Sequence, residues 1–328
     1  MRPVTVVVPI VAVLALLPAI LSGYHISFMI QMFMWVALAG SWNLISGLTG
    51  YVSFGHVAFF GVGTYTAALL ITKAGWHWLA AGLAGCIPAM LLALVIGYPC
   101  LRLKGPYFAI SMLGLNEVVR ALVSYFERFT GGGSGISLPP IVAIVPVYYA
   151  MAAAAIVVTV VTYLIITSRF GLRLLAIRED ELAADAMGIN TAAYKLYAFL
   201  LSAAFPGIVG GFYAWYASHV EPMSVFPLIT TITMIIMCLF GGSGTVLGPV
   251  LGAVLLSIMQ ELVWARFLWV HQALLGALIV AVVLLMPRGI LGILRHHFRL
   301  LLFDSMAELL MALVRGIAPR KPVFEDSS

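Results

Sequence analysis

The sequence predicts an all-α integral membrane protein, and three observations support this fold class. Hydrophobic residues make up 63% of the 328 residues, whereas charged residues make up only 9%. Soluble domains contain about 45–50% apolar and about 25% charged residues, so a compact globule of this chain would leave much apolar surface in water. Apolar runs of about 20 residues recur along the chain, and a helix of that length spans a bilayer.

Ten apolar segments are expected to span the membrane. We expect a transmembrane domain over residues 1–290 and an amphipathic interfacial tail over residues 291–328. The third and eighth segments are short and have glycine-rich flanks, which indicates broken or re-entrant helices. The expected spans are residues 4–21, 26–46, 56–72, 78–97, 106–126, 144–167, 194–217, 225–240, 246–264 and 270–286.

The basic residues predict the orientation. With both termini in the cytoplasm, 13 of the 17 Lys and Arg residues face the cytoplasm and three face outward, while Arg120 falls within a span. This asymmetry follows the positive-inside rule. The cytoplasmic residues are Arg2, Arg102, Lys104, Arg169, Arg173, Arg178, Lys195, Arg288, Arg295, Arg299, Arg315, Arg320 and Lys321, and the outer ones are Lys73, Arg128 and Arg266.

The most polar stretch lies between the sixth and seventh spans, over residues 168–193, and is called the coupling segment below. A helical segment of this kind on the cytoplasmic side offers a surface to a partner protein, and a solvated connecting loop is the alternative. Its charged residues are Arg169, Arg173, Arg178, Glu179, Asp180, Glu181 and Asp185.

Residues 45–70 are too rich in glycine for one uniform helix, because each Gly costs about 1 kcal/mol relative to Ala in a helix interior. A turn or half-helix is expected near Gly47–Gly50. Irregular backbone at membrane depth is tolerated only where it is buried in protein or lines a cavity. Asn43, Ser53 and His56 are therefore candidate pathway residues, with purely structural hydrogen bonding as the alternative.

Ionisable side chains also occur within the fifth span. Glu117 and Arg120 are three residues apart on a helix, so they can pair, and Asn116 adds hydrogen-bonding capacity beside them. Charges within spans are costly and mark functional candidates, so these three residues are predicted to belong to the pathway or its gate. A structural ion pair that fixes this helix to its neighbours is the alternative.

Small residues recur at helical spacing in two places. Gly244, Gly248 and Gly252 are predicted to form a stripe on one helix face, and Gly207 and Gly211 form a second pair. Such stripes allow helix backbones to approach closely in lipid. A sliding or opening lining is the functional alternative.

The sequence lacks the motifs of several common classes of nucleotide-binding, hydrolytic and metal-binding proteins. It contains no GxxxxGK[ST], HExxH or GxSxG motif and no Cys/His metal cluster, so we expect no catalytic residues, no metal and no cofactor bound by this chain. The three cysteines lie in or beside apolar runs and are interpreted as small hydrophobic residues that pack against their neighbours. The net charge of +5 is attributed to the cytoplasmic side of a membrane rather than to nucleic-acid binding.

Five segments in order carry a family resemblance. Within the coupling segment, SRFGLRLLAIREDELAADAMGIN (168–190) resembles the cytoplasmic loop of permease subunits of branched-chain amino acid ABC importers, the LivM type. The other segments are GLTGYVSFGHVAFFGVGTY (47–65), LRLKGPYFAISMLGLNEVVR (101–120), FGGSGTVLGPVLGA (240–253) and PRGILGI (287–293).

The resemblance implies a ten-span, type II ABC-importer-like permease of the bacterial inner membrane. It implies as partners a second related permease subunit, two P-loop ATPase subunits that hold ATP-Mg, and an external substrate-binding protein. Residues 178–188 would be the helix that docks on an ATPase. The residues implied in this docking are Arg178, Glu179, Asp180, Glu181, Ala183, Ala184 and Gly188.

The coupling segment departs from the general EAA pattern of such permeases at its Glu position, and the downstream IxLP element is also absent. Ala183, Ala184 and Gly188 match that pattern, but Leu182 stands at its Glu position and Glu181 lies one residue earlier.

The expected function is import of branched-chain or other small amino acids driven by ATPase subunits. Within the same family, urea, amide or aromatic-acid import is the alternative substrate class. A self-sufficient secondary transporter, with Glu117 and His56 coupling protons, is an alternative of another class, as is a membrane scaffold without transport.

Overall fold

The computed structural model describes residues 16–141, 143–266, 276 and 289–290, and within them the chain is almost entirely helical. A short 3-10 helix η1 (Leu17–Ala19) precedes the bundle. The longer helices are α2 (Gly23–Trp42), α3 (His56–Ala74), α5 (Cys86–Cys100), α6 (Pro106–Tyr125), α8 (Val145–Ile166), α11 (Thr191–Ala217), α13 (Leu228–Gly241) and α14 (Gly248–Arg266). The shorter ones are α4 (Trp78–Ala84), α7 (Glu127–Thr130), η3 (Gly132–Ser134), α9 (Arg169–Glu179), α10 (Glu181–Ala186) and α12 (Pro222–Val225).

Seven helical segments among the described residues are long and apolar enough to cross a membrane. They correspond to the second through eighth expected spans. The ninth appears as α14, whose apolar part, Gly248–Leu262, is shorter. Most of the first expected span, the whole of the tenth except residue 276, and the tail over 291–328 lie outside the described residues.

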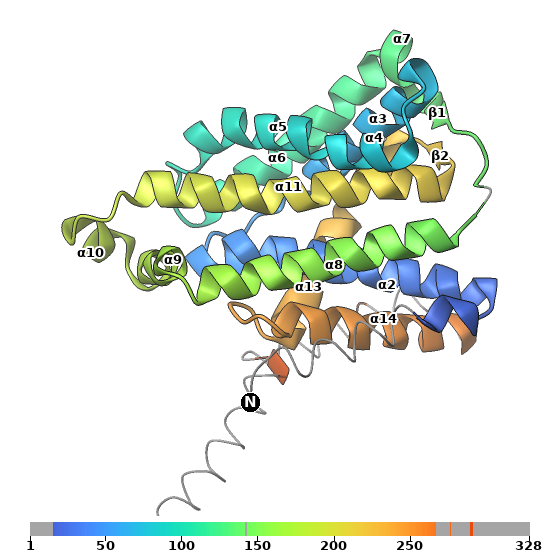
Figure 1. The fold of residues 1–328 in the computed structure, drawn as a ribbon. Helices are drawn as coiled ribbons and strands as arrows, with labels where there is room; N and C mark the ends of the chain where they lie inside the picture. The colour runs from blue at the N-terminus through green and yellow to red at the C-terminus, as the bar shows by residue number, and fades with distance from the viewer. Residues whose placement is uncertain (1–15, 142, 267–275, 277–288, 291–328) are drawn as a thin grey trace, which may run out of the picture.

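Helix α11 forms the centre of the bundle. It packs against α3, α4 and α5 on one side and against α2 and α8 on the other (Figure 1). Its close approach to α3 depends on glycine, because a Cβ atom at Gly63 would lie 2.0 Å from the carbonyl oxygen of Gly207. A Cβ at Gly211 would likewise lie 2.6 Å from the backbone of Gly82. The predicted packing role of Gly207 and Gly211 is therefore confirmed.

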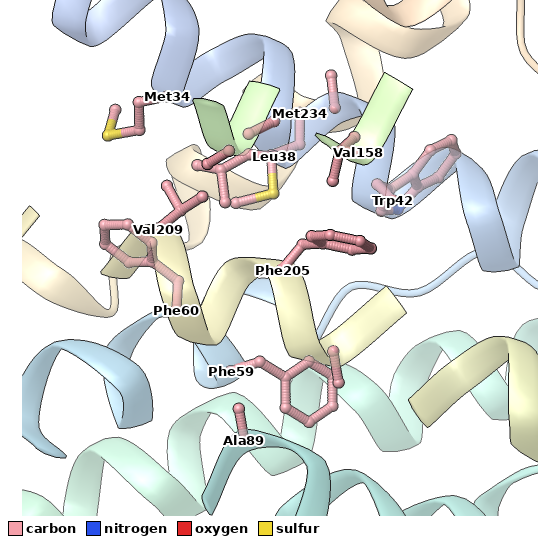
Figure 2. Close-up of a cluster of buried hydrophobic side chains, with 14 of the residues drawn as sticks. Met34, Leu38, Trp42, Phe59, Phe60, Ala89, Val158, Phe205, Val209 and Met234 are labelled. Atoms are coloured by element: carbon pink, nitrogen blue, oxygen red, sulfur yellow. The ribbon is translucent and has the colours of Figure 1, made fainter. Parts of the chain in front are cut away.

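Apolar side chains from α2, α3, α8 and α13 pack around α11 (Figure 2). Leu38 and Trp42 of α2 lie on one side of this cluster, and Phe59 of α3 lies on the other, with Phe205 of α11 between them. All four side chains are buried. Burial of such side chains contributes about 1.5–3 kcal/mol each in water, but within lipid it is tight packing that holds helices together.

Two interruptions divide the apolar helices. Helix α2 continues into a π-helical turn, η2 (Asn43–Gly47), and ends before the first break, residues 48–55. Gly50 in this break has φ +78°, a conformation that favours glycine. The expected turn near Gly47–Gly50 is thus present. The second break, residues 242–247, separates α13 from α14.

The predicted glycine stripe is wrong at one position. Gly244 lies in the second break with φ +75°, so it is not on a helix. Gly248 begins α14, and a Cβ at Gly252 would lie 1.8 Å from the carbonyl oxygen of Met237. Of the three predicted positions, Gly252 serves close packing of α14 on α13. A Cβ at Gly248 would lie 2.1 Å from the Gly242 carbonyl oxygen of the second break, and Gly244 serves the turn.

The two ends of the bundle are built differently. Helices α9 and α10 form one end, and the antiparallel pair of two-residue strands β1 (Ile136–Ser137) and β2 (His219–Val220) lies at the other (Figure 1). Lys73, at the end of α3, donates hydrogen bonds to the carbonyl oxygens of Arg128 and Phe129 at this second end. Two of the three expected outer basic residues therefore lie together, away from the coupling segment.

Candidate functional site

The coupling segment folds into two short helices joined at Asp180. Asp180 caps α10, because its carboxylate accepts hydrogen bonds from the backbone N–H groups of Leu182 and Ala183 at 2.8 and 3.0 Å. Gly188 ends the turn with φ +82°, and Asn190 caps α11 through the N–H of Ala193. Within the acidic run 179–181, Asp180 and Glu181 thus lie at the N-terminus of α10, where negative charge is favourable, whereas Glu179 is the last residue of α9.

Helix α10 exposes an apolar surface at the tip of the bundle. Leu182 is 71% exposed and Met187 is 83% exposed, and Ala183 is also exposed. Ala184 differs from the expected smooth docking face, because it is only 4% exposed. The reason is that α10 packs against α9 and α11, and Ala184 is the residue of α10 that is buried. Large exposed apolar side chains in a polar segment are typical of contact surfaces.

A buried lysine joins α10 to the membrane-spanning helices. Lys195, in the first turns of α11, is 3% exposed, and its Nζ atom donates to Glu181 Oε1 at 2.7 Å. The same ammonium donates to the Tyr51 hydroxyl and to the Leu101 carbonyl oxygen, both at 2.9 Å. Tyr51 in turn donates to Glu181 Oε2 at 2.5 Å. These four residues are called the junction, and they link α10, α11, the first break and the end of α5.

The protonation states of the junction residues match the hydrogen bonds that they make. Burial alone would raise the pKa of Glu181, but the hydrogen bonds from Lys195 and Tyr51 and the nearby positive charge hold it below its usual value. Burial, with the adjacent Glu181 carboxylate, raises the pKa of Tyr51. Glu181 is therefore an ionised acceptor and Tyr51 a protonated donor at neutral pH. All three protons of the ammonium have acceptors, so its burial leaves no unpaired donor.

Arg178 connects the coupling segment to both breaks. Its Nη1 atom donates to the carbonyl oxygen of Gly47 at 2.8 Å. A Cβ atom at Gly244 would lie 2.5 Å from the same Nη1, and one at Gly50 would lie 3.4 Å from Arg178 Cγ. The guanidinium group therefore lies where the two breaks meet. A Cβ at Gly244 would displace it, whereas at Gly50 the contact is ordinary and the φ of +78° is what disfavours a side chain.

Asn43 fastens the two breaks to each other. Its side chain is fully buried, accepts a hydrogen bond from the Gly244 N–H at 2.7 Å and donates one to the Thr245 carbonyl oxygen at 2.9 Å. These bonds satisfy backbone groups that the interrupted helices leave open. The structure thus gives Asn43 the hydrogen-bonding role that was the alternative to a pathway role.

Ser53 and His56 lie together at the start of α3. Both are fully buried, and the Ser53 hydroxyl lies 2.9 Å from His56 Nδ1. The Nε2 atom of His56 is buried and makes no hydrogen bond to any described residue. The carbonyl oxygen of Ser53 also accepts a hydrogen bond from the Trp42 indole N–H. The first break is therefore bonded to α2 through Trp42 and to α3 through His56.

The third group of candidates is on α6. Glu117 and Arg120 form the expected ion pair, but their side chains are 47% and 38% exposed on the surface of this single chain. Asn116 is fully buried, and its amide group donates to the Phe226 carbonyl oxygen at 3.2 Å and to Glu117 Oε1 at 3.5 Å. Within the described ranges, no hydrogen bond joins this group to Ser53 or His56, so the predicted pathway residues form separate clusters.

Sequence reasoning did not single out Tyr51, Lys195, Leu101 or the exposed Met187. Lys195 lies only a few residues inside a long apolar helix that begins at Thr191, which is the signal that marks it as unusual. Its partners are distant in sequence, and no local spacing reveals them. Among the described residues, no group of three His, Cys, Asp or Glu side chains is placed to hold a metal ion.

Comparisons with known proteins extend these observations. The family described as "Branched-chain amino acid transport system / permease component" matches residues 24–283. The chain is 30% identical to the high-affinity branched-chain amino acid transport system permease protein LivM of Escherichia coli K12, over 79% of this chain and 68% of that protein. The LivM protein of Salmonella typhimurium is 29% identical, over 86% of this chain and 73% of the relative.

A second type of permease protein is also similar. The permease protein LivH of Escherichia coli K12 is 26% identical, over 83% of this chain and 98% of its own length. No solved structure gives a significant match. With its apolar helices, its two breaks and a family match over most of its length, this chain belongs to the branched-chain amino acid transport system permease family.

Proposed function

We propose that this chain is one permease subunit of an ATP-driven importer for branched-chain amino acids, and that α10 is the helix that docks on an ATPase subunit. The assembly would contain a second related permease, two P-loop ATPases with ATP-Mg and an external binding protein. It would lie in the bacterial inner membrane with both termini of this chain in the cytoplasm. The names of the LivM and LivH relatives support the substrate class and a paired permease.

The exposed tip of α10 is the observation that carries the docking role. Leu182 and Met187 project from a helix whose other face is fixed to the bundle. Of the acidic run, Asp180 caps the helix and Glu181 binds Lys195, so both are used internally. Glu179 and Asp185 are exposed and remain for basic residues of a partner.

The junction offers a route for mechanical coupling. When the ATPases move α10, Glu181 carries the displacement to Lys195 and so to the base of α11. Arg178 carries it to Gly47 and the first break. Because α11 runs the length of the bundle, a shift at its base moves the opposite end of the subunit as well. Packed cores respond to such shifts by switching between arrangements rather than by deforming continuously.

Docking can be tested by introducing charge at the tip. Leu182→Asp and Met187→Asp place a carboxylate in the proposed apolar contact, and recovery of ATPase subunits with a tagged chain should fall by about tenfold or more. ATP-dependent leucine uptake should fall with it. Leu172→Asp, at a 63% exposed leucine of α9, is the matched control and should retain both.

The outcome that contradicts this proposal is specific. If both α10 variants recover ATPases and import leucine as the unchanged protein does, α10 is not the docking helix. If the tagged chain is recovered alone and moves solute in liposomes without ATP, the secondary-transporter alternative holds instead.

A further inference from the structure

A cavity lies at the end of the bundle opposite the coupling segment. It has a volume of about 490 Å³ and is formed where α2 and the last turns of α11 meet β2 and α12. Binding sites for small molecules typically have volumes of about 300–1,000 Å³. The cavity is therefore large enough for one small amino acid and a few water molecules.

Three of the side chains that line the cavity are aromatic. Trp35 comes from α2, whereas Tyr213 and Tyr216 are adjacent on the last turns of α11, with ring centroids 6.3 Å apart. Tyr213 is held from behind by Phe60, whose ring centroid lies 5.3 Å away. Such walls suit a branched aliphatic side chain, and aromatic faces also attract an ammonium group.

One acidic side chain lines the cavity. Glu221 is partly buried, and among the described residues its carboxylate has neither a cationic partner nor a hydrogen-bond donor. Gln31 and His219 also line the cavity and offer N–H donors, since only Nδ1 of His219 is near another polar side chain, Ser137. The cavity thus presents an acceptor for an ammonium group, donors for a carboxylate and an apolar wall.

We infer that this cavity binds the transported amino acid as a zwitterion on the outer side of the subunit. Glu221 accepts the ammonium group, Gln31 and His219 donate to the carboxylate, and the Trp35, Tyr213 and Tyr216 walls surround the aliphatic side chain. The cavity and the junction lie at the two ends of the same helix, α11, so movement at Lys195 changes the walls at Tyr213 and Tyr216. This inference rests on the proposed function for its substrate class.

Protection of an engineered thiol tests occupancy directly. Ser224 lines the cavity and is exposed, so Ser224→Cys can be labelled by a membrane-impermeant maleimide in a chain where Cys86, Cys100 and Cys238 are replaced by Ala. The assay uses the two assembled permeases with their ATPase subunits, without the external binding protein. Leucine should slow the labelling, whereas 4-methylpentanoate, which has the same carbon skeleton without the ammonium group, should not.

The carboxylate is tested by a second variant and a matched control. Glu221→Gln keeps the shape but removes the charge, and should raise the half-protecting concentration of leucine by about tenfold. Glu127→Gln, at an exposed carboxylate of the same end of the molecule, should leave it unchanged. ATPase recovery with each variant verifies that the importer is assembled.

The possible results distinguish a failure of the cavity inference from a failure of the proposed importer function. If the complete importer moves leucine with ATP but leucine does not protect the thiol, the cavity inference is overturned and the proposed function stands. The same holds if 4-methylpentanoate protects equally or if Glu221→Gln has no effect. If the assembled importer moves no branched-chain amino acid, both the proposed function and the ligand inferred for the cavity are overturned.

Discussion

The coupling end and the opposite half of the bundle each contain an ion pair, and the two pairs differ in burial and in reach. Lys195 and Glu181 are 3% and 21% exposed, and they join separate helices. Arg120 and Glu117 are 38% and 47% exposed and lie one turn apart on α6. Exposed pairs contribute about 0–1 kcal/mol, whereas breaking a buried pair costs about 3–5 kcal/mol because a charge is left unpaired. Only the buried pair can hold distant elements in one arrangement.

The largest effect is expected at the buried cation. Lys195→Met keeps the length of the side chain but leaves Glu181 ionised and without its partner. We expect the free energy of unfolding in detergent to fall by about 3 kcal/mol and ATP-dependent uptake to be lost. Denaturant titration of the purified chain measures the first and leucine uptake the second. A variant as stable and active as the unchanged protein would show that the junction contributes neither to stability nor to transport.

A smaller effect is expected at the tyrosine of the junction. Tyr51→Phe removes one hydroxyl, which leaves Lys195 with two acceptors and Glu181 with one donor. The loss of a hydrogen bond to a charged group corresponds to about 1.5–3 kcal/mol. Uptake should fall while recovery of ATPase subunits stays normal, because Tyr51 is not on the exposed face of α10. Loss of ATPase recovery in this variant would contradict the separation of docking from transmission.

The buried pair should also give the stability of the protein an acid dependence. The pKa of Glu181 is lower in the folded state than in the unfolded chain, so the pair stabilises fully above the unfolded value of about 4.3. This stabilisation is lost as the pH falls through the folded-state pKa. The stability difference between the unchanged protein and Glu181→Gln should therefore shrink below about pH 4.3. A difference that stays constant from neutral to acid pH would contradict this account.

The smallest effect is expected at the exposed pair. Arg120→Met should change the free energy of unfolding by less than about 1 kcal/mol, since Arg120 and Glu117 lie three residues apart on the same helix. The same denaturant titration as for Lys195→Met makes the comparison direct. If this variant abolishes uptake while stability is unchanged, Arg120 acts in the pathway, as predicted from its place within a span.

The difference between the pairs also explains which features the sequence reveals. The Glu117–Arg120 pair and the turn near Gly50 depend on residues a few positions apart, so their spacing predicts them. The junction depends on Tyr51, which lies 144 residues from Lys195. The inward position of Ala184 likewise depends on which face of α10 meets other helices. Such contacts follow from packing, which a single sequence does not display.

The hydrogen bonds of Asn43 impose an order on biogenesis. Asn43 and Gly244 are 201 residues apart, which corresponds to about 10–40 s of translation at about 5–20 residues per second. During that time the first two helices already occupy the membrane while the amide of Asn43 still lacks its final partners. The last third of the chain therefore supplies the hydrogen-bond partners of a residue in the first third, and a chain released before Gly244 is made would leave the amide of Asn43 without them.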